Sequence, residues 1–551
     1  TWENHVMLGL LSSNVSLSGP IIKNKLSFSI AARRSYINKI ILPMVNKFIK
    51  ESISKFDNEY MFEDFNLKIL YKINPKNRIE ASGYLGKDLF TIYNKVNYIE
   101  NDVSWGNLAS TLKWKHIISE KKSVNTSISI SNYHFNYDMK QDLYFMKLNT
   151  GMRTYKLKNE WLFTRDAGFV RFGMEMQLHT YTPSVVDAKI KDFTLDLGKS
   201  SKLHSIENGL FIDYPFRVGK SFSLIAGLRL SQFAHIGPYT HFGNEQSNII
   251  TDSSTYGKNE IVKNYVSPEP RLLSTFHINS FSSIKTSATF NTQYSHIVPI
   301  ISSALPAEMW LPSTIDLTPQ KVLQFSCGYF ARKWNLEMGI DTYWKMLKDI
   351  RDTRGNMLNF YDNGNIQQLV ARGEGRTWGV ELSVEKNTGK LTYSIAYTYS
   401  RSLKLFPEIN NGMVFPDKYD KPHEVTASLN YDLTPRWNVS ALFTYSSGIN
   451  ITVPVARYII QNSIVNIYGT KNGFRMPTYH RADVSVKYLF INKKKVKGEI
   501  IASVVNVYNH KNPYFIYYET LGSIEKYQLE VKKREVWLFP ILPSLSLHFS
   551  F

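Results

Sequence analysis

The feature that most constrains the fold is a regular succession of long segments joined by unlike connections. Short polar turns and longer polar loops alternate from about residue 5 to the end of the chain. Within segments such as 124–131 and 391–400, apolar and polar residues alternate with a period of two, which predicts β-strands with one apolar and one polar face. The predicted strands run about 10–18 residues, against a usual length of about 5–6. This pattern indicates an all-β, antiparallel, up-and-down transmembrane β-barrel with short turns at one end and long loops at the other.

The connections differ in composition as well as in length. The short turns are rich in Gly, Pro, Asn, Ser and Lys, which hairpin turns require. One long connection, residues 38–61, contains a stretch at 43–50 whose apolar spacing predicts a short loop helix. The other long loops are predicted at residues 187–203, 237–263, 299–318, 350–370, 407–418, 454–475 and 519–533.

The last segment of the chain alternates up to its final residue. Its apolar face includes Leu545, Leu547, Phe549 and Phe551, and its polar face consists of Ser and His side chains. In a barrel such a strand closes the wall, with its apolar side against lipid. We therefore predict that these four residues serve membrane insertion of the C-terminal strand.

The strand count predicts where the barrel begins. We count 21 segments, and both the first and the last run toward the short-turn side. Closed antiparallel barrels of bacterial single chains have an even number of strands. We therefore expect 22 strands, with the first one upstream of Thr1. The chain begins without Met and without a signal peptide, as expected of a mature protein or a fragment.

Composition excludes several classes of protein. No apolar run approaches the roughly 18 residues of a spanning helix, whereas an aromatic content of 14% is typical of barrels with aromatic girdles. The net charge of +20 comes from scattered residues, with small clusters in short turns such as 492–497, and the sequence contains no zinc motif, phosphate loop or basic helix, so nucleic acid is not a predicted partner. The surplus favours contact with outer-membrane lipid and lipopolysaccharide. Cys327 is the single cysteine, which excludes an intrachain disulfide.

Short stretches along the whole chain resemble the barrel of TonB-dependent outer-membrane receptors, in the moderately sized branch found in Bacteroidota. Their order and spacing carry the resemblance more than any single stretch does. The stretches are Gly9–Pro20, Ser29–Tyr36, Glu308–Thr314, Leu317–Gln320, Gly373–Glu381, Tyr419–His423, Arg475–Asp483 and Val505–Pro513.

The resemblance implies a 22-stranded barrel over residues 1–551, with a plug domain that this sequence does not contain. It also implies a location in the bacterial outer membrane, and partners that include the TonB complex, bound through an N-terminal segment missing here, and the barrel assembly machinery. A surface lipoprotein is a further candidate partner, although this chain is shorter than the family members that use one. No cofactor is expected.

The candidate ligand-binding residues lie in the predicted loops. His235, Tyr239, His241 and Phe242 form a His/aromatic group suited to haem, a chelate or a sugar ring, and the alternative is an aromatic girdle with solvated histidines. The same two interpretations, a ligand site or an aromatic girdle, apply to a second group, which consists of Tyr133, His134, Phe135 and Tyr137. Trp310, next to Met309, either packs a loop or contacts ligand. Arg351 and Arg354 either hold an anion or are solvated loop charges.

These observations favour active import of a scarce, bulky ligand of the siderophore, haem, cobalamin or oligosaccharide class through a plugged lumen. A barrel of 22 strands is too wide for side chains to fill, which is why a plug is required. Two alternatives stay open: a passive channel constricted by an inward-folded loop, and a receptor-like barrel that docks a surface protein. Catalysis is not expected, because neither a Gly-x-Ser-x-Gly elbow nor a His-Glu-x-x-His motif occurs.

Overall fold

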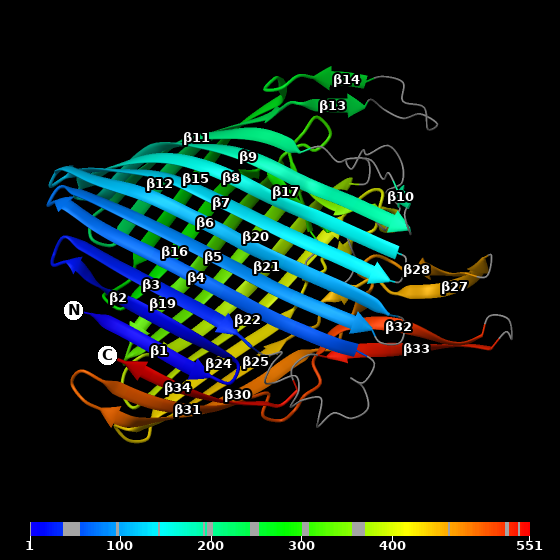
Figure 1. Ribbon diagram of the computed structural model, residues 1–551. Coiled ribbons are helices and arrows are strands. Elements are labelled where there is room, and N and C mark those ends of the chain that lie inside the picture. Colours follow the sequence, from blue (N-terminus) through cyan, green and yellow to red (C-terminus); the bar gives the residue numbers. More distant parts are fainter. Residues whose placement is uncertain are drawn as a thin grey trace.

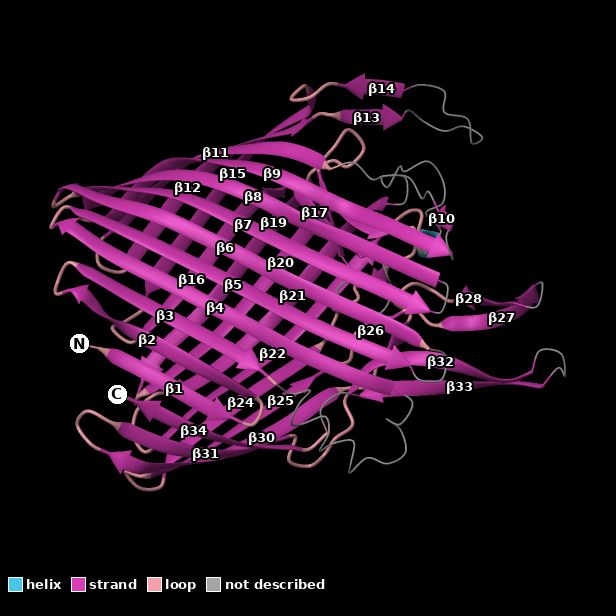
Figure 2. Cartoon of the chain, viewed as in Figure 1, coloured by secondary structure: helices cyan, strands magenta, loops and turns pink. Residues whose placement is uncertain are grey.

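The chain forms a closed, tilted, antiparallel β-barrel with short turns at one end and long hairpins at the other (Figures 1 and 2). The computed structural model describes residues 2–36, 56–94, 98–141, 144–190, 193–195, 202–242, 253–299, 308–354, 370–460, 463–523, 528–537 and 540–551. The predicted loop helix at 43–50 lies outside these residues. Among them, no helix has the length and hydropathy needed to cross a membrane.

The main sheet of the described chain contains 24 strands. Two of them, β10 (Phe193–Leu195) and β23 (Phe415–Pro416), are short additions at loop ends, and the other twenty-two form the barrel wall. The wall strands are β1 (Glu3–Gly9), β2 (Ser12–Ile22), β3 (Leu26–Ser35), β4 (Phe56–Asn74), β5 (Asn77–Asn94), β6 (Ile99–Ser119), β7 (Lys122–Gln141), β8 (Tyr144–Arg165), β9 (Gly168–Ile190), β11 (Leu203–Val218), β12 (Phe222–Ile236), β15 (Ile261–His277), β16 (Ser282–Gln293), β19 (Gln320–Lys333), β20 (Leu336–Thr353), β21 (Val370–Lys386), β22 (Leu391–Leu405), β24 (His423–Asp432), β25 (Trp437–Ser446), β30 (Tyr479–Asn492), β31 (Lys497–Val505) and β34 (Leu542–Ser550).

Short elements decorate the long-loop end. Most are hairpins that pair only with themselves. They are β13 (Tyr239–Phe242) with β14 (Ser253–Tyr256), β17 (Ser295–Pro299) with β18 (Glu308–Pro312), β26 (Asn450–Ile451) with β29 (Phe474–Arg475), β27 (Pro454–Ile460) with β28 (Ser463–Tyr468), β32 (Pro513–Ser523) with β33 (Gln528–Trp537), and the 3-10 helix η3 (Asn410–Gly412).

The barrel is closed by its own first and last strands. β1 pairs with β34, with Val6 opposite Phe549 and Leu8 opposite Leu547, and β1 also pairs with β2. Both chain ends therefore lie at the short-turn end (Figure 1). The 22-stranded barrel is confirmed, but its first strand lies within the chain and not upstream of Thr1.

The difference has a simple cause in the sequence. The count of 21 treats the stretch from His5 to Leu17 as a single segment, whereas the chain reverses after Gly9. The reversal contains no Pro or Asn, and Leu8 and Leu10 on either side keep their side chains exposed. An apolar tight turn on the lipid side carries no compositional signal that distinguishes it from a continuing strand.

The closing strand has the predicted apolar outer face. Leu545 and Phe551 are exposed, and Leu547 and Phe549 are half-buried. On the opposite face, Ser546 and His548 share a hydrogen bond of 3.1 Å. Cys327 lies on β19 as a free cysteine on the exposed surface, beside the exposed Phe325, as expected of a small apolar residue in a strand.

Candidate functional site: the barrel lumen

The two faces of each wall strand have opposite characters. On β11, Leu210 and Ile212 point outward with 59% and 47% of their surface exposed, while Glu207 and Asp213 alternate with them and join ion pairs with neighbouring strands. Apolar side chains tolerate exposure of this size where lipid covers them. The charged face is therefore the luminal one.

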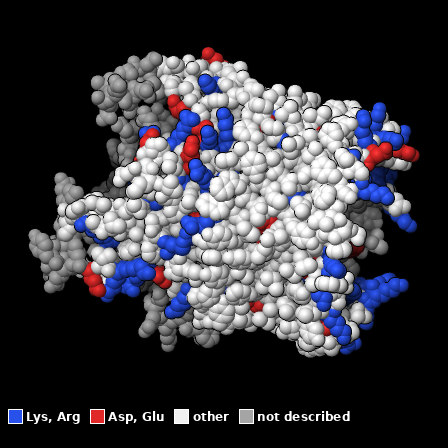
Figure 3. All heavy atoms as spheres, turned by 180° about the vertical axis from the view of Figure 1, so that it is seen from behind, with Lys and Arg blue, Asp and Glu red and all other residues white. Residues whose placement is uncertain are grey.

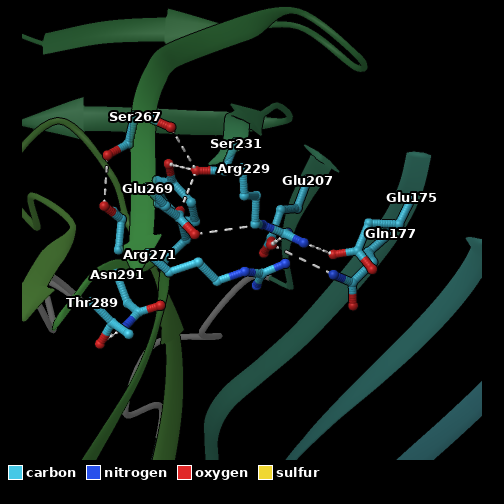
Figure 4. Close-up of polar contacts among 12 residues, drawn as sticks. Glu175, Gln177, Glu207, Arg229, Ser231, Ser267, Glu269, Arg271, Thr289 and Asn291 are labelled. Carbon is cyan, nitrogen blue, oxygen red and sulfur yellow. Dashed lines mark hydrogen bonds and ion pairs between the residues drawn. The ribbon is translucent and has the colours of Figure 1, made fainter. Parts of the chain in front are cut away.

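Arg229 on β12 is the centre of a luminal ion network (Figure 4). Its guanidinium group pairs with Glu175 on β9, with Glu207 on β11 at 3.2 Å, and with Glu269 on β15 at 3.5 Å. Lys156 on β8 adds a second cation 2.8 Å from Glu175. Five successive wall strands are tied together by these pairs. Since the guanidinium presents several donors in a fixed plane, one arginine satisfies carboxylates from three directions.

A second cluster lies next to the first along the same strands. Asp213 on β11 accepts hydrogen bonds of 2.6–2.8 Å from both Arg171 on β9 and Arg271 on β15. Figure 4 shows the Arg271 side chain close to that of Arg229. The carboxylate of Asp213 is thus doubly neutralised, and the two clusters form one continuous polar strip.

The strip is electrically balanced. Four carboxylates, those of Glu175, Glu207, Glu269 and Asp213, face four cations, those of Lys156, Arg171, Arg229 and Arg271. A balanced set does not attract ions of one sign. Its ion pairs link the luminal side chains of neighbouring strands into a polar surface on which a polar solute or a folded plug can rest.

The connection between β16 and β19 folds into the lumen. We call its described residues, 294–299 and 308–319, the inward connection. Its hairpin β17–β18 contacts β8, β9 and β11 through β18, and β20 through β17. Met309 and Leu311 of the hairpin are buried together with Phe135 and Tyr181, which point inward from β7 and β9. A side chain facing an open lumen would be exposed, so the burial of these aromatics shows that the hairpin covers them.

Hydrogen bonds fix the inward connection to one side of the barrel. The hydroxyl groups of Tyr181 and Ser295 lie 2.7 Å apart. The hydroxyl of Thr150 on β8 donates to the carbonyl oxygen of Glu308 at 3.4 Å. Trp310 packs edge-on against Tyr133 of β7, with 6.5 Å between ring centroids.

Other hydrogen bonds fix the same connection to strands farther round the wall. Tyr265 on β15 donates through its hydroxyl to the carbonyl oxygen of Thr314 at 2.6 Å. The buried Arg351 at the end of β20 donates to the carbonyl and hydroxyl oxygens of Thr318 at 2.7 and 2.9 Å. The connection therefore bridges wall segments on both sides of its own strands and narrows the lumen below the loops.

His296 of β17 is buried within this connection. Its Nε2 atom shares a hydrogen bond of 2.9 Å with the hydroxyl of Ser313. Burial, together with the positive charge of Arg351, lowers the pKa of His296 to about 3. The imidazole is therefore neutral at pH 7.

We expect mild acid to loosen the inward connection. Once released into water, His296 would bind a proton below its ordinary pKa of about 6.5, whereas in place it does so only near pH 3. Stability that is complete above pH 6.5 is then lost progressively as the pH falls toward 3. Hydrogen-exchange protection of residues 308–319 should fall between pH 7.5 and 4.5, and His296→Gln should remove most of this dependence. Protection of β32, which contains no histidine, is the internal control, and an unchanged pH profile in His296→Gln would contradict the assignment.

The predicted His/aromatic group does not form an exposed loop site. His235 is fully buried at the end of β12, and its ring meets that of Tyr239 edge-on at 4.6 Å between centroids. Neither ring nitrogen of His235 has a hydrogen-bond partner within the described part of the chain. His241 lies instead 3.3 Å from Asp316 of the inward connection. Phe242 ends β13, and its side chain is not among those described.

The other predicted residues lie either at the inward connection or in the connection between β22 and β24. Trp310 belongs to the inward connection and Arg351 anchors it. Arg354 is ion-paired with Glu408 in the connection between β22 and β24. Of the seven candidates, Tyr239, His241, Trp310 and Arg351 therefore meet at the inward connection, and Arg354 does not. Whether any of them contacts a ligand stays a prediction.

The aromatic stretch on β7 is split by strand alternation. Tyr133, Phe135 and Tyr137 face the lumen and pack with the inward hairpin. The ring of His134 faces the other way, close to Gly106 of β6. Three of the four residues thus line the narrowed part of the lumen.

A separate polar clamp holds the loops above the lumen. The carboxylate of Asp420 is fully buried, and it accepts hydrogen bonds from Arg475 at 2.6 Å, Arg401 at 3.2 Å and the backbone amide of Ser402 at 2.6 Å. These partners join the connection between β22 and β24 to the one between β25 and β30. Asp420 and Arg475 belong to two of the stretches that carry the family resemblance, 419–423 and 475–483.

Lys471 extends the clamp to β20. Its ammonium group lies 2.5 Å from Asp352 and donates to the carbonyl oxygen of Thr353 at 2.7 Å. The side chain of Asn410 bonds the backbone of Lys471 in both directions, at 2.7 and 3.1 Å. Both loops are therefore held over one side of the mouth.

The luminal network was missed by the sequence analysis, although a signal for it exists. Arg171 and Glu175 are an even number of residues apart on β9 and therefore lie on the same face of the strand. Glu269 and Arg271 lie on one face of β15 for the same reason. Charged residues at alternate positions on successive predicted strands indicate a luminal face. Their pairing, however, depends on strand register, which the sequence does not give directly.

Comparison with known proteins agrees with this architecture. The family model described as "TonB dependent receptor-like, beta-barrel" matches residues 54–509. A search of curated proteins finds no match. Similar solved structures include the ferric yersiniabactin uptake receptor FyuA from Yersinia pestis (13% identity, TM-score 0.66, covering 100% of this chain and 80% of that one). Others are the siderophore receptor PiuA from Acinetobacter baumannii (13%, 0.65, 100% and 81%) and the FrpB iron transporter from Neisseria meningitidis (11%, 0.64, 100% and 82%).

At these identities the solved structures establish the fold, while the family match covers most of the chain, from the connection before β4 to the residues that follow β31. The closed 22-stranded barrel with an apolar exterior and a charged lumen agrees with this match. The chain therefore belongs to the TonB-dependent receptor β-barrel family, whose members are transporters of the bacterial outer membrane.

Proposed function

We propose that this chain is the barrel of an active importer that takes up a scarce, bulky ligand through a plugged lumen. The observation that carries the proposal is the closed 22-stranded wall with its balanced, ion-paired luminal strip. A wall of this width leaves a lumen that its own side chains do not fill. A folded plug is the natural occupant of a rigid, polar, electrically neutral lining.

Directed uptake needs two states of the lumen. A ligand moves only if the energised state binds it less well than the resting state does. We propose that a plug domain outside residues 1–551 supplies this difference, and that the TonB complex pulls it through an N-terminal segment. The barrel assembly machinery is the proposed insertion partner, acting on β34, and a surface lipoprotein is a further proposed partner at the loops.

Metal chelates lead the candidate ligands. Similar solved structures include an uptake receptor for ferric yersiniabactin, a ferric citrate transporter and a copper transporter. The aromatic and histidine groups near the narrowed lumen, Tyr133, Tyr137 and Tyr239 among them, suit a flat or ring-bearing chelate such as a siderophore or haem. Cobalamin and oligosaccharides stay on the list, since stacking on aromatic rings serves them as well.

A passive channel is the second candidate, and one observation favours it. The inward connection narrows the lumen by itself, fixed by Tyr181, Tyr265 and Arg351. A pore constricted in this way would need no plug. Docking of a surface protein through the long-loop hairpins is the remaining alternative.

Single-channel conductance in planar bilayers separates these functions. We expect the full precursor-derived protein to be closed, because a plug fills it, and the 551-residue barrel to conduct. Shortening the inward connection to a Gly/Ser turn should raise the conductance of the barrel but leave the full protein closed. A steadily open full-length protein would overturn the importer and support the channel. If the barrel alone is closed as well, the loops seal it and the docking role gains support.

A further inference from the structure

The positive charge of this protein is concentrated at the short-turn end. We define the basic rim as the ten short turns with two strand residues on either side of each. The rim comprises residues 21–27, 73–78, 118–123, 164–169, 217–223, 276–283, 332–337, 385–392, 431–438 and 491–498. It contains eighteen Lys and Arg against five Asp and Glu. The surplus of thirteen is most of the net charge of +20, although the rim is a small part of the chain.

The charges of the rim are not neutralised within the protein. Arg78 lies 3.7 Å from Glu80, and Arg332 lies 3.2 Å from Glu337. The other sixteen basic residues of the rim have no carboxylate within 4 Å in the described chain, and all but Lys386 are exposed. Surface cations without partners are free to bind anions from outside.

Aromatic side chains place the rim at the boundary between lipid and water. The ammonium group of Lys333 lies 4.5 Å from the ring centroid of Trp334 and 5.0 Å from that of Phe281. Lys122 and Arg165 likewise lie 5.9 Å from the rings of Phe163 and Tyr214. Trp and Tyr mark the level of lipid headgroups, and Lys and Arg extend from it toward water. Figure 3 shows the charged residues gathered at the two ends of the barrel, with a nearly uncharged band between them.

The charges also encircle the barrel. Nine of the ten turns carry at least one Lys or Arg, and only the turn of residues 276–283 has none. The highest density is in the β30–β31 turn, where Lys493, Lys494, Lys495 and Lys497 are exposed. A protein partner would bind one patch, whereas a complete ring of cations matches the lipid that surrounds the whole circumference.

We infer that the basic rim binds the headgroups of anionic phospholipids in the periplasmic leaflet of the outer membrane. Short turns face the periplasm in barrels of this kind. The phosphate of each headgroup lies at the level of the aromatic rings. Lys side chains bind it through a single ammonium charge, and Arg side chains bind it through two parallel hydrogen bonds. The ring would hold a shell of phosphatidylglycerol-type lipid around the barrel. This inference does not depend on the transported ligand.

The test measures lipid preference of the full protein by native mass spectrometry. Purified protein is mixed in detergent with equal amounts of phosphatidylglycerol and phosphatidylethanolamine, and the ratio of bound lipids is counted. We expect phosphatidylglycerol to be preferred. K493Q/K494Q/K495Q should lower the ratio of bound phosphatidylglycerol to phosphatidylethanolamine about threefold, because loss of these cations weakens the binding of the anionic lipid only. Raising the ammonium acetate concentration should reduce the preference of the unsubstituted protein in the same direction.

K532Q/K533Q/R534Q is the control, since it removes three exposed cations from β33 at the opposite end, two of which pair with Glu530 and Glu535. An unchanged ratio in the rim variant, or an equal loss in the control, would overturn the inference. Displacement of phosphatidylglycerol by inorganic phosphate would also overturn it. The same holds if lipopolysaccharide, which occupies the other leaflet, competes for the site as well as phosphatidylglycerol does. Folding is checked by heat-modifiable migration on a gel. If the first variant does not fold, K23Q/K25Q/K76Q tests a different arc of the rim with the same expected result.

Discussion

Replacement of Arg229 by methionine is expected to lower the free energy of unfolding of the barrel by about 3 kcal/mol, as for other buried pairs that lose one partner. Methionine keeps much of the packing volume but removes the charge. Glu175 and Glu269, both largely buried, would then lose a cation, and Glu207 would lose its arginine as well. Lys156 would still neutralise Glu175, so the largest uncompensated charge should fall on Glu269.

The measurement is urea unfolding of the protein in detergent, followed by intrinsic fluorescence. The matched control is Arg332→Met, because Arg332 is exposed and has the single partner Glu337. That change should stay within about 0.5 kcal/mol. Adding Glu269→Gln to Arg229→Met should recover part of the loss. A loss equal to that of the control would show that luminal water, and not Arg229, stabilises the carboxylates.

Replacement of Asp420 by alanine is expected to destabilise the loop clamp by about 2–3 kcal/mol, since a buried charged hydrogen-bond centre is lost. The carboxylate has no exposed surface, and Arg475, Arg401 and the amide of Ser402 all donate to it. Two partly buried guanidinium groups would then lose the carboxylate between them. The effect should be local, because in the described part of the chain only the loop end of one wall strand, β22, contacts this residue, through Arg401 and Ser402.

Limited proteolysis of the folded protein measures this effect. Cleavage within residues 406–422 and 470–478 should become several times faster, while the barrel keeps its heat-modifiable migration. Asp166→Ala, in an exposed short turn without an ion pair within the described chain, serves as the control and should leave cleavage unchanged. Equal cleavage of the Asp420 variant and the natural protein would mean that Lys471 and Asn410 hold the loops without the Asp420 centre.

The sequence determined the barrel through local periodicity. A side chain on a strand points to one of two faces, so residues such as Leu210 and Asp213 reveal their face by position alone. The parity argument also led to the correct strand number, 22. It misplaced the first strand because the reversal after Gly9 uses apolar residues on the lipid side, where a turn and a strand have the same composition.

Binding residues were harder to place, because their neighbours come from distant strands. His235 was expected as a solvated histidine at the start of a loop, yet it lies at the end of β12 with its ring buried against that of Tyr239. Arg351 was expected to hold an anion or remain solvated, and it donates instead to Thr318. In both cases the residue type was informative about polarity but not about the partner.

Sequence alone thus determined the fold class and the membrane-facing surface, each of which follows from side-chain type at consecutive positions. Only the tertiary structure decided that β1 closes the barrel, that Arg229 gathers three carboxylates, and that residues 294–299 and 308–319 enter the lumen. These features depend on register between strands and on contacts across the barrel. Such contacts are fixed by the closed geometry of the wall and by hydrogen bonds that no local pattern encodes.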